Sequence, residues 1–274
     1  MNDELEILAE SAERLFADHV TPDLFRRVEA GEWPDVLWRA VETAGFERAE
    51  MPAFAVCVAR VAGRFAAPIP LPETILATSS LEGAGLSVPL GALTIAPVDA
   101  AQPIAIDAGG TLSGTARRVP WARHAAHIAV ICDGPEGETL ALVETARSEI
   151  SPGQNIAGEP RDDVCFDGTL SVEAAGGVSL GLVHEQAALL RAAQIAGALE
   201  TVLAMTVQYA GERRQFGRPI AKFQAVQHHL AALAGHTAAV CAALEAVVGA
   251  PDFLAVAAAK AGASEAAGEA AAIA

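Results

Sequence analysis

The sequence predicts an α+β fold made of a helical segment, a β segment and a second helical segment. Apolar residues recur at helical spacing from residue 2 to about 83, and again from His184 onward. Between about 86 and 180 they form short runs separated by Gly, Asp, Pro and Asn, which is typical of strands joined by turns. We therefore expect a helical N-terminal domain at 1–83, a β-barrel or β-sandwich domain at 84–182 and a C-terminal helical bundle at 183–274.

The N-terminal segment opens with a charged amphipathic pattern, in which Leu5, Leu8, Ala12 and Leu15 repeat at helical spacing. A second helix is predicted over residues 35–44. Pro34 and Asp35 supply its start, and Gly45 supplies its stop. The proline-rich passage around residues 68–77 leads into a further short helix.

The middle segment contains the apolar runs ALTIAPV, PIAIDA, HIAVICD and TLALVET. They predict the strands of a small barrel or sandwich. Residues 155–168 are rich in turn formers and include Arg161, Asp162 and Asp163. Paired aspartates can indicate a metal, but no third oxygen ligand follows at loop spacing, so we expect a hairpin rim or a subunit contact and assign no metal.

The C-terminal segment predicts helices over 185–212, from 219 to about 249, and from 252 to the end. Gly217 ends the first helix and Pro219 restarts the chain. The last 24 residues are about half alanine and reach Ala274 without a Gly, Pro or basic cap. We expect the chain to stop inside a helix, with the bundle incomplete.

Net charge, apolar patterning and cysteine content limit the classes of partner and the cellular location that we expect for this protein. The chain has 274 residues, 52% of them hydrophobic, and its 18 Lys and Arg against 34 Asp and Glu give a net charge of -16, which repels a phosphate backbone. We expect no nucleic-acid partner. The sequence has no basic leader and no continuous apolar span of about 18 residues, so we expect a cytoplasmic protein with no membrane partner. Its four scattered cysteines predict neither a disulfide nor a metal site.

One short stretch departs from this acidic character. Arg213, Arg214, Arg218 and Lys222 lie within ten residues of one another around Phe216. A solvated charged turn between two helices is one interpretation. A phosphate site is the other, because Arg binds planar anions, a flat ring stacks on a heterocycle and Gly217 permits close approach of the backbone.

The wider string YAGERRQFGRPIAKFQAVQHHLA resembles the acyl-CoA dehydrogenase family, whose pattern here is Y-x-x-x-R-x-Q-F-G-x-x-I-x-x-F-Q. The matching residues are Tyr209, Arg213, Gln215, Phe216, Gly217, Ile220, Phe223 and Gln224. The α, β, α order agrees with the resemblance. It implies that Arg213, Gln215 and Phe216, with Gln224 nearby, contact the pyrophosphate and adenine end of an FAD bound largely by a neighbouring subunit. It also implies a homo- or hetero-oligomer, either a dimer or a tetramer.

The resemblance implies an oxidoreductase that converts an acyl-CoA thioester to the 2-enoyl-CoA and passes electrons to an electron-transferring flavoprotein. A carboxylate removes the α proton and the flavin accepts the β hydride. One branch of the family carries this base near Ala187, two residues from Glu185. Two residues on a helix correspond to a rotation of about 200°. We interpret Glu185 as a first-turn residue that stabilises the helix dipole and leave the catalytic base unassigned.

The flavin cradle also departs from the family pattern. No M-T-E-P-x-x-G-S-D loop opens the β segment, and Arg118, Val119 and Pro120 stand where W-I-T is expected. Trp121 either stacks on the ring or packs in a core. These departures resemble the degenerate subunit of α2β2 heterotetramers within the family, some of which act on steroid side chains, and that subunit is our expectation. The alternative is a non-catalytic scaffold or interaction protein that kept the fold and lost FAD.

Overall fold

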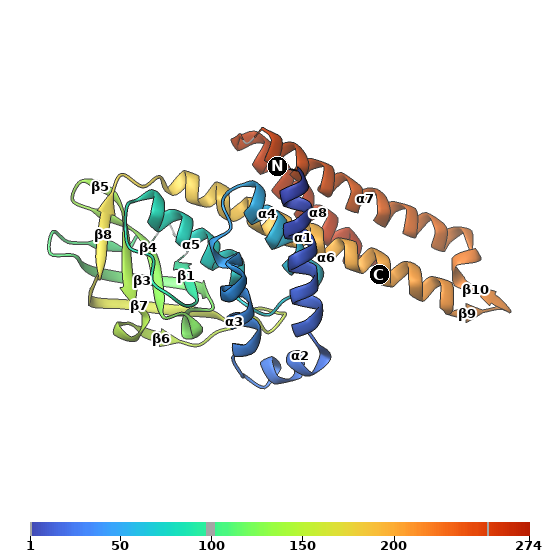
Figure 1. The fold of residues 1–274 in the computed structure, drawn as a ribbon, viewed down its shortest axis with the longest axis horizontal. Coiled ribbons are helices and arrows are strands. Elements are labelled where there is room, and N and C mark those ends of the chain that lie inside the picture. Colours follow the sequence, from blue (N-terminus) through green and yellow to red (C-terminus); the bar gives the residue numbers. More distant parts are fainter. Residues whose placement is uncertain (1, 97–101, 251) are drawn as a thin grey trace. The chain divides into compact units, whose positions relative to one another are not determined.

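The computed structural model describes residues 2–96, 102–250 and 252–274, and it confirms the predicted fold class (Figure 1). Helices precede a β-sheet, and helices follow it. The helices before the sheet are α1 (Asn2–His19), α2 (Pro22–Glu29), α3 (Asp35–Ala44), α4 (Ala53–Arg64) and α5 (Leu71–Gly83), with a 3₁₀ turn η1 (Phe46–Arg48). The long helices after it are α6 (Leu180–Glu212), α7 (Gln224–Gly249) and α8 (Phe253–Ile273). The domain boundaries at 83 and 182 stay predictions.

The chain forms two compact units that are discontinuous in sequence. Unit 1 contains Met1–Asp18, Met51–Ala67 and Ala188–Ala274, which places α1, α4 and most of the C-terminal helices together. Unit 2 contains His19–Glu50 and Pro68–Ala187, which places α2, α3 and α5 with the sheet.

Helix α3 has the predicted bounds. Gly45 follows it in the left-handed conformation, at φ 74°, and its N–H donates to the carbonyls of Glu42 and Val41. Glycine is favoured there because the position has positive φ, so the sequence signal and the structure have one physical cause. Leu37, Trp38 and Val41 form the buried face of the helix.

The middle segment is one eight-stranded, mostly antiparallel sheet in the order β6-β7-β3-β2-β4-β5-β8, with β1 pairing parallel to β4. The strands are β1 (Leu93–Ala96), β2 (Ala105–Ile106), β3 (Thr111–Pro120), β4 (His127–Gly134), β5 (Gly137–Glu144), β6 (Glu149–Ser151), β7 (Arg161–Leu170) and β8 (Glu173–Gly176). Short 3₁₀ turns η2 (Ala122–His124) and η3 (Thr145–Arg147) join some of them. Alternate residues such as Leu112, Ile128, Val143 and Phe166 share one buried cluster.

Helix α5 is attached to this sheet by a buried hydroxyl. The Thr74 Oγ1 donates to the Leu93 carbonyl at 2.9 Å and accepts from the Leu93 N–H at 3.1 Å. Almost every residue of α5 from Leu71 to Leu81 is buried. The helix therefore forms part of the core of unit 2.

Residues 155–168 belong to the predicted hairpin, in which β6 pairs antiparallel with β7, but Asp162 does not lie on an exposed rim. Asp162 is fully buried, and its carboxylate accepts hydrogen bonds from the side chain and the backbone N–H of Arg123 and from the Gly153 N–H. Burial alone would raise the pKa of this carboxyl, but these hydrogen bonds together hold it below its usual range. Asp162 fixes the strand ends around η2, because a buried carboxylate needs such partners.

All three tryptophans lie in one aromatic cluster of unit 2. Trp33 stacks on His124 with ring centroids 5.3 Å apart, and it contacts Trp38 and Trp121 at 5.9 and 6.3 Å. Trp121 is 3% exposed and its Nε1 donates to Glu159 Oε1 at 3.1 Å. The packing interpretation of Trp121 therefore holds, since neither ring face is open to a ligand.

We expect acid to weaken unit 2 through His124. Burial, followed by the charge of Arg123, lowers the pKa of His124, against a smaller opposite effect of Asp162. A depressed folded-state pKa means that the stabilising contribution is complete above the unfolded value of about 6.5 and is lost as pH falls through the folded value. The urea midpoint followed by tryptophan fluorescence should fall between pH 7 and 5, and His124→Phe should flatten that dependence. An unchanged pH slope in the variant would refute this assignment.

In unit 1, helices α4 and α6 touch backbone to backbone. A Cβ built on Gly197 would lie 1.8 Å from the Arg60 carbonyl oxygen, and one on Gly63 would lie 2.2 Å from that of Gln194. The two glycines therefore permit a helix crossing that no larger residue allows.

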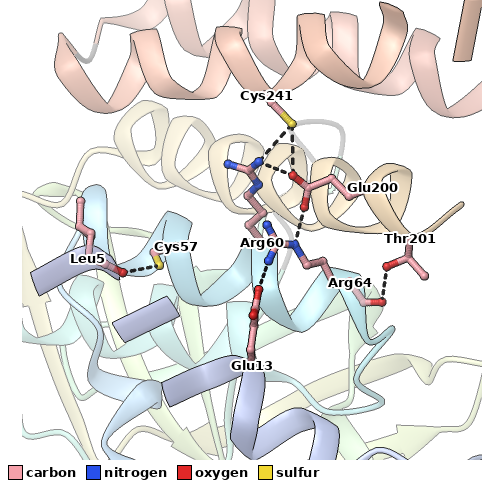
Figure 2. Close-up of polar contacts among 8 residues, drawn as sticks. All are labelled: Leu5, Glu13, Cys57, Arg60, Arg64, Glu200, Thr201 and Cys241. Atoms are coloured by element: carbon pink, nitrogen blue, oxygen red, sulfur yellow. Dashed lines mark hydrogen bonds and ion pairs between the residues drawn. The ribbon is translucent and has the colours of Figure 1, made fainter. Parts of the chain in front are cut away.

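Charged side chains connect the helices around this crossing (Figure 2). Glu200 of α6 forms ion pairs with Arg60 and Arg64 of α4, and Arg64 also pairs with Glu13 of α1. The Sγ of Cys241 on α7 lies 3.3 Å from Arg60 Nη2. Burial would raise the pKa of Glu200, but hydrogen bonds from the two arginines outweigh it and hold the pKa low. The network is only partly buried, so we interpret it as a device for helix registry.

Helix α6 begins earlier than predicted, at Leu180 and not at 185. The Ser179 Oγ accepts a hydrogen bond from the Leu182 N–H at 3.3 Å, and Glu138 Oε2 accepts one from the Leu180 N–H at 2.8 Å. Ser179 thus acts as an N-cap, a signal that was present in the sequence.

Helices α6 and α7 are each long and apolar enough to cross a membrane by length and composition. We expected no such segment, because neither helix is continuously apolar. Core helices of soluble proteins meet the same criterion, and α6 carries the ion-paired Glu200. The finding is weak evidence for a membrane.

Candidate functional site

The cationic stretch forms a β-hairpin at the tip where α6 turns into α7 (Figure 1). Helix α6 ends at Glu212, and β9 (Arg214–Gln215) pairs antiparallel with β10 (Arg218–Pro219). A 3₁₀ turn η4 (Ile220–Lys222) then leads into α7 at Gln224. The corner between two helices is as predicted. The predicted end of the first helix at residue 212 is confirmed. Gly217 lies in the hairpin turn and does not end that helix, and α7 begins at Gln224 and not at Pro219, so these two expectations were wrong.

The hairpin closes through a turn of two residues with positive φ. Phe216 has φ 50° and Gly217 has φ 80°, which corresponds to a type I′ turn. The Ile220 N–H donates to the Arg213 carbonyl at 2.9 Å and extends the pairing by one step. Pro219 faces Arg214, a position that needs no ladder N–H. The turn residues, the Ile220–Arg213 hydrogen bond and the position of Pro219 are therefore all compatible with one hairpin conformation.

Pleating sorts the side chains of the hairpin onto two faces. Gln215 pairs with Arg218, and Arg213 is joined to Ile220, so these residues belong to one face. Arg214 belongs to the opposite face with Pro219. Arg213 and Gln215, which the sequence predicted to act together, are therefore brought onto the same side.

Phe216 is displayed to solvent at a conformational cost. Its side chain is 92% exposed, although a non-glycine residue in the left-handed region costs about 1–2 kcal/mol. Its ring meets that of Phe223 edge to face at 6.1 Å, and the Arg218 guanidinium lies 4.4 Å over the centroid of Phe223. Such a cation–π contact contributes about 0.5–1 kcal/mol at an exposed site. An exposed aromatic ring in a strained turn, next to a stacked arginine and phenylalanine, favours a binding role.

We expect Phe216→Asn to keep the hairpin and Phe216→Val to loosen it. Asn-Gly is preferred in type I′ turns, whereas a β-branched side chain is disfavoured at positive φ. Hydrogen exchange at the Ile220 amide should stay as slow with Asn and become faster with Val, by about fivefold for about 1 kcal/mol. Equal protection in the two variants would mean that the turn does not hold Phe216 at positive φ.

The corner is electrostatically open. In the part of the chain that the structure describes, none of Arg213, Arg214, Arg218 and Lys222 makes an ion pair, and all four are exposed. The neighbouring Glu212 instead accepts a hydrogen bond from Gln208 at 2.8 Å. Four cations on an acidic chain attract an anion with several charges.

Gln224 and Glu185 lie differently with respect to this corner. Gln224 opens α7, whose N-terminal N–H groups favour an anion. Glu185 is in the second turn of α6 and belongs to unit 2, whereas the corner belongs to unit 1. The first-turn interpretation of Glu185 was wrong, because α6 starts at Leu180. The structure does not group Glu185 with the other predicted site residues.

The sheet offers little to a flavin ring. The Pro120 carbonyl accepts from the Thr94 Oγ1 at 2.6 Å, and proline has no N–H to donate. Arg118, at φ 57°, has its N–H occupied by the Asp163 carboxylate at 2.8 Å. Trp121 is buried in the aromatic cluster. The corner thus fits the diphosphate and adenine part of FAD, while the strand positions do not fit the isoalloxazine.

Sequence reasoning named Arg218 and Phe223 but gave neither a role in the site. Arg218 and Phe223 are five residues apart and stack on each other at the hairpin. A helical interpretation of the corner does not bring the two side chains together. A type I′ assignment to Phe216-Gly217 would have been needed to find this stacking.

Comparison with known proteins agrees with the fold. The family model for "Acyl-CoA dehydrogenase, C-terminal domain" matches residues 182–274. The protein "Acyl-CoA dehydrogenase IpdE2" of Mycolicibacterium smegmatis is 31% identical over 280 residues, which covers 97% of this chain and 83% of that protein. "Benzylmalonyl-CoA dehydrogenase" of Aromatoleum aromaticum is 35% identical over 109 residues, covering 35% of this chain and 29% of that protein.

Solved structures give the same result. The structure described as "Tcur3481-Tcur3483 steroid ACAD G363A variant" superposes with a TM-score of 0.89 at 27% identity, covering 99% of this chain and 86% of that one. The "glutaryl-coenzyme A dehydrogenase glutaryl-CoA complex" gives 0.84 at 19% identity, covering 100% and 84%, which shows the fold alone. Because a 31% identical relative aligns with 97% of this chain, the chain belongs to the acyl-CoA dehydrogenase family.

Proposed function

We propose that this chain is a subunit of a heteromeric FAD-dependent acyl-CoA dehydrogenase and that it binds one end of the cofactor. The observation that carries the proposal is the contrast between two places in the structure. The hairpin of residues 213–219 presents cations that form no ion pair with any described residue, together with an exposed ring, whereas the strand end at residues 118–121 is closed by its own contacts.

The corner would hold the diphosphate and adenine end of the cofactor. Arg213 supplies a planar guanidinium, Gln215 an amide and Phe216 a flat face, while Gln224 lies at the N-terminus of α7. When bound, FAD supplies acceptance of the hydride. The residues of this chain contribute binding and orientation of the distant end of the cofactor.

A second chain would supply the remaining parts. Glu185, the candidate base, lies in the compact unit that does not contain the corner, and the strand end lacks a donor for the ring. The corner is the part that the resemblance assigns to the neighbouring subunit's cofactor. We infer an oligomer in which this chain reaches across to a partner that binds the isoalloxazine and carries the carboxylate base.

A steroid-derived acyl-CoA is the substrate we propose to test first. The superposed structure at 27% identity is described as a steroid ACAD, and its description joins the two names Tcur3481 and Tcur3483. The 31% identical relative is an acyl-CoA dehydrogenase matched over 97% of this chain. A straight-chain acyl-CoA is the matched comparison substrate. We propose electron-transferring flavoprotein as the electron acceptor. We also propose that the protein is cytoplasmic.

Absorption between 350 and 500 nm tests the proposal directly. The chain is purified alone and after co-expression with the product of the neighbouring gene. We expect flavin bands only in the co-expressed complex, together with oxidation of the acyl-CoA.

Two other outcomes would contradict the proposal. Full flavin occupancy and activity of the chain alone would show a self-sufficient homomeric enzyme. A co-purified complex whose FAD binding does not depend on the residues of this chain would favour a scaffold role.

A further inference from the structure

The hairpin contains two exposed arginines that are alike in charge and differ in placement. Arg214 and Arg218 are four residues apart, and neither makes an ion pair in the described part of the chain. The register pairs Arg218 with Gln215 and Arg214 with Pro219. Alternate positions of a strand face opposite sides, so Arg218 shares the face of Arg213 and Gln215, and Arg214 does not.

Arg218 is also the one of the pair that packs on an aromatic ring. Its guanidinium lies 4.4 Å over the ring of Phe223, and that ring is held edge to face against Phe216. A guanidinium that stacks on an aromatic ring can still direct its N–H groups outward in the plane of the group. Less rotamer freedom is then lost when it binds an anion, which increases affinity without any new contact.

We propose that Arg218 is a further ligand of the cofactor's diphosphate, positioned by Phe223, and that Arg214 is not a ligand. This inference rests on the proposed function, since it concerns the same corner. It adds a second guanidinium to that of Arg213 and gives Phe223 the role of a positioning residue.

Binding of ADP to the flavin-free co-expressed complex, measured by calorimetry at low ionic strength, tests the proposal without needing activity. We expect Arg218→Ala to weaken binding about tenfold, as for the loss of a charge-assisted hydrogen bond, and Arg214→Ala to weaken it at most about twofold by long-range charge alone. The two variants change net charge equally, so only placement separates them. Equal losses in both would overturn the proposal, as would the absence of ADP binding to the unmodified complex.

Phe223→Leu tests the positioning role. It should weaken ADP binding about threefold when Arg218 is present and have no effect when Arg218 is replaced by alanine. This pattern is expected because Phe223 would act only through its contact with Arg218. An equal effect in both backgrounds would assign Phe223 to general packing and remove its positioning role.

Arg213→Ala distinguishes the two levels of inference. If Arg213→Ala weakens ADP binding while Arg218→Ala and Arg214→Ala remain alike, the proposed function stands and the role of Arg218 fails. If Arg213→Ala has no effect, the corner is not a diphosphate site and both fail.

Discussion

Gly197→Ala should destabilise unit 1 more than any other single methyl group added to α6. The new Cβ would lie 1.8 Å from the Arg60 carbonyl oxygen and 2.8 Å from the Arg64 amide nitrogen. These atoms are joined by the i to i+4 hydrogen bond of α4, so relief requires the two helices to separate. We expect a loss of roughly 3 kcal/mol in the free energy of unfolding, at the upper end of the usual range for overpacking.

Gly211→Ala is the matched control on the same helix. No atom lies within 4 Å of the position that its new methyl group would take, so only the higher helix propensity of alanine acts. We expect a gain of roughly 0.5 kcal/mol.

Urea denaturation followed by far-ultraviolet circular dichroism is the suitable measurement for both glycine variants. All three tryptophans lie in unit 2, so fluorescence would report the wrong part of the chain. Equal midpoints for the two variants would show that α4 and α6 do not touch at Gly197.

The close approach at Gly197 marks a limit of sequence reasoning. Gly45 could be predicted because its cause is local: a helix ends there and positive φ is required. Gly197 lies within an apolar helical pattern, where glycine indicates only a lower helix propensity. Its cause is the backbone of Arg60 and Arg64 on a helix far away in sequence, and no local pattern encodes that distance.

The same distinction applies to the charged residues. The ion pairs of Glu200 with Arg60 and Arg64 join residues 140 and 136 apart in sequence. Burial of Asp162 likewise depends on Arg123, which lies on another element. The sequence showed these groups as ordinary charges, because their partners are chosen by tertiary packing.

The candidate site was predictable as a set of residues and not as a conformation. The family pattern gave Arg213, Gln215, Phe216 and Gln224, and these lie at one corner. The pattern could not show that Phe216 adopts positive φ, because phenylalanine has no preference for that region. The expectation that Gly217 ends the first helix failed for this reason.

Arg213→Ala should reduce the affinity of the assembled enzyme for FAD by about 30-fold, equivalent to about 2 kcal/mol for hydrogen bonds to a charged group. Arg213 is exposed and makes no ion pair within the described residues, so its removal should leave the folded chain unchanged. The measurement is reconstitution of the apo complex with FAD, followed by flavin fluorescence. Thermal unfolding of the chain without FAD is the control.

Arg213→Lys separates charge from geometry at the same position. Lysine keeps the positive charge but lacks the planar fork that binds two phosphate oxygens together. If Arg213 binds the diphosphate in a bidentate manner, the lysine variant should recover about a third to a half of the lost binding energy, and the recovered part should vanish as salt increases. Full recovery would reduce Arg213 to one member of a diffuse positive field. Unchanged FAD affinity in both variants would remove the corner from the flavin site. Among the described residues of unit 1, no other place combines an arginine without an ion pair and an exposed aromatic ring at positive φ.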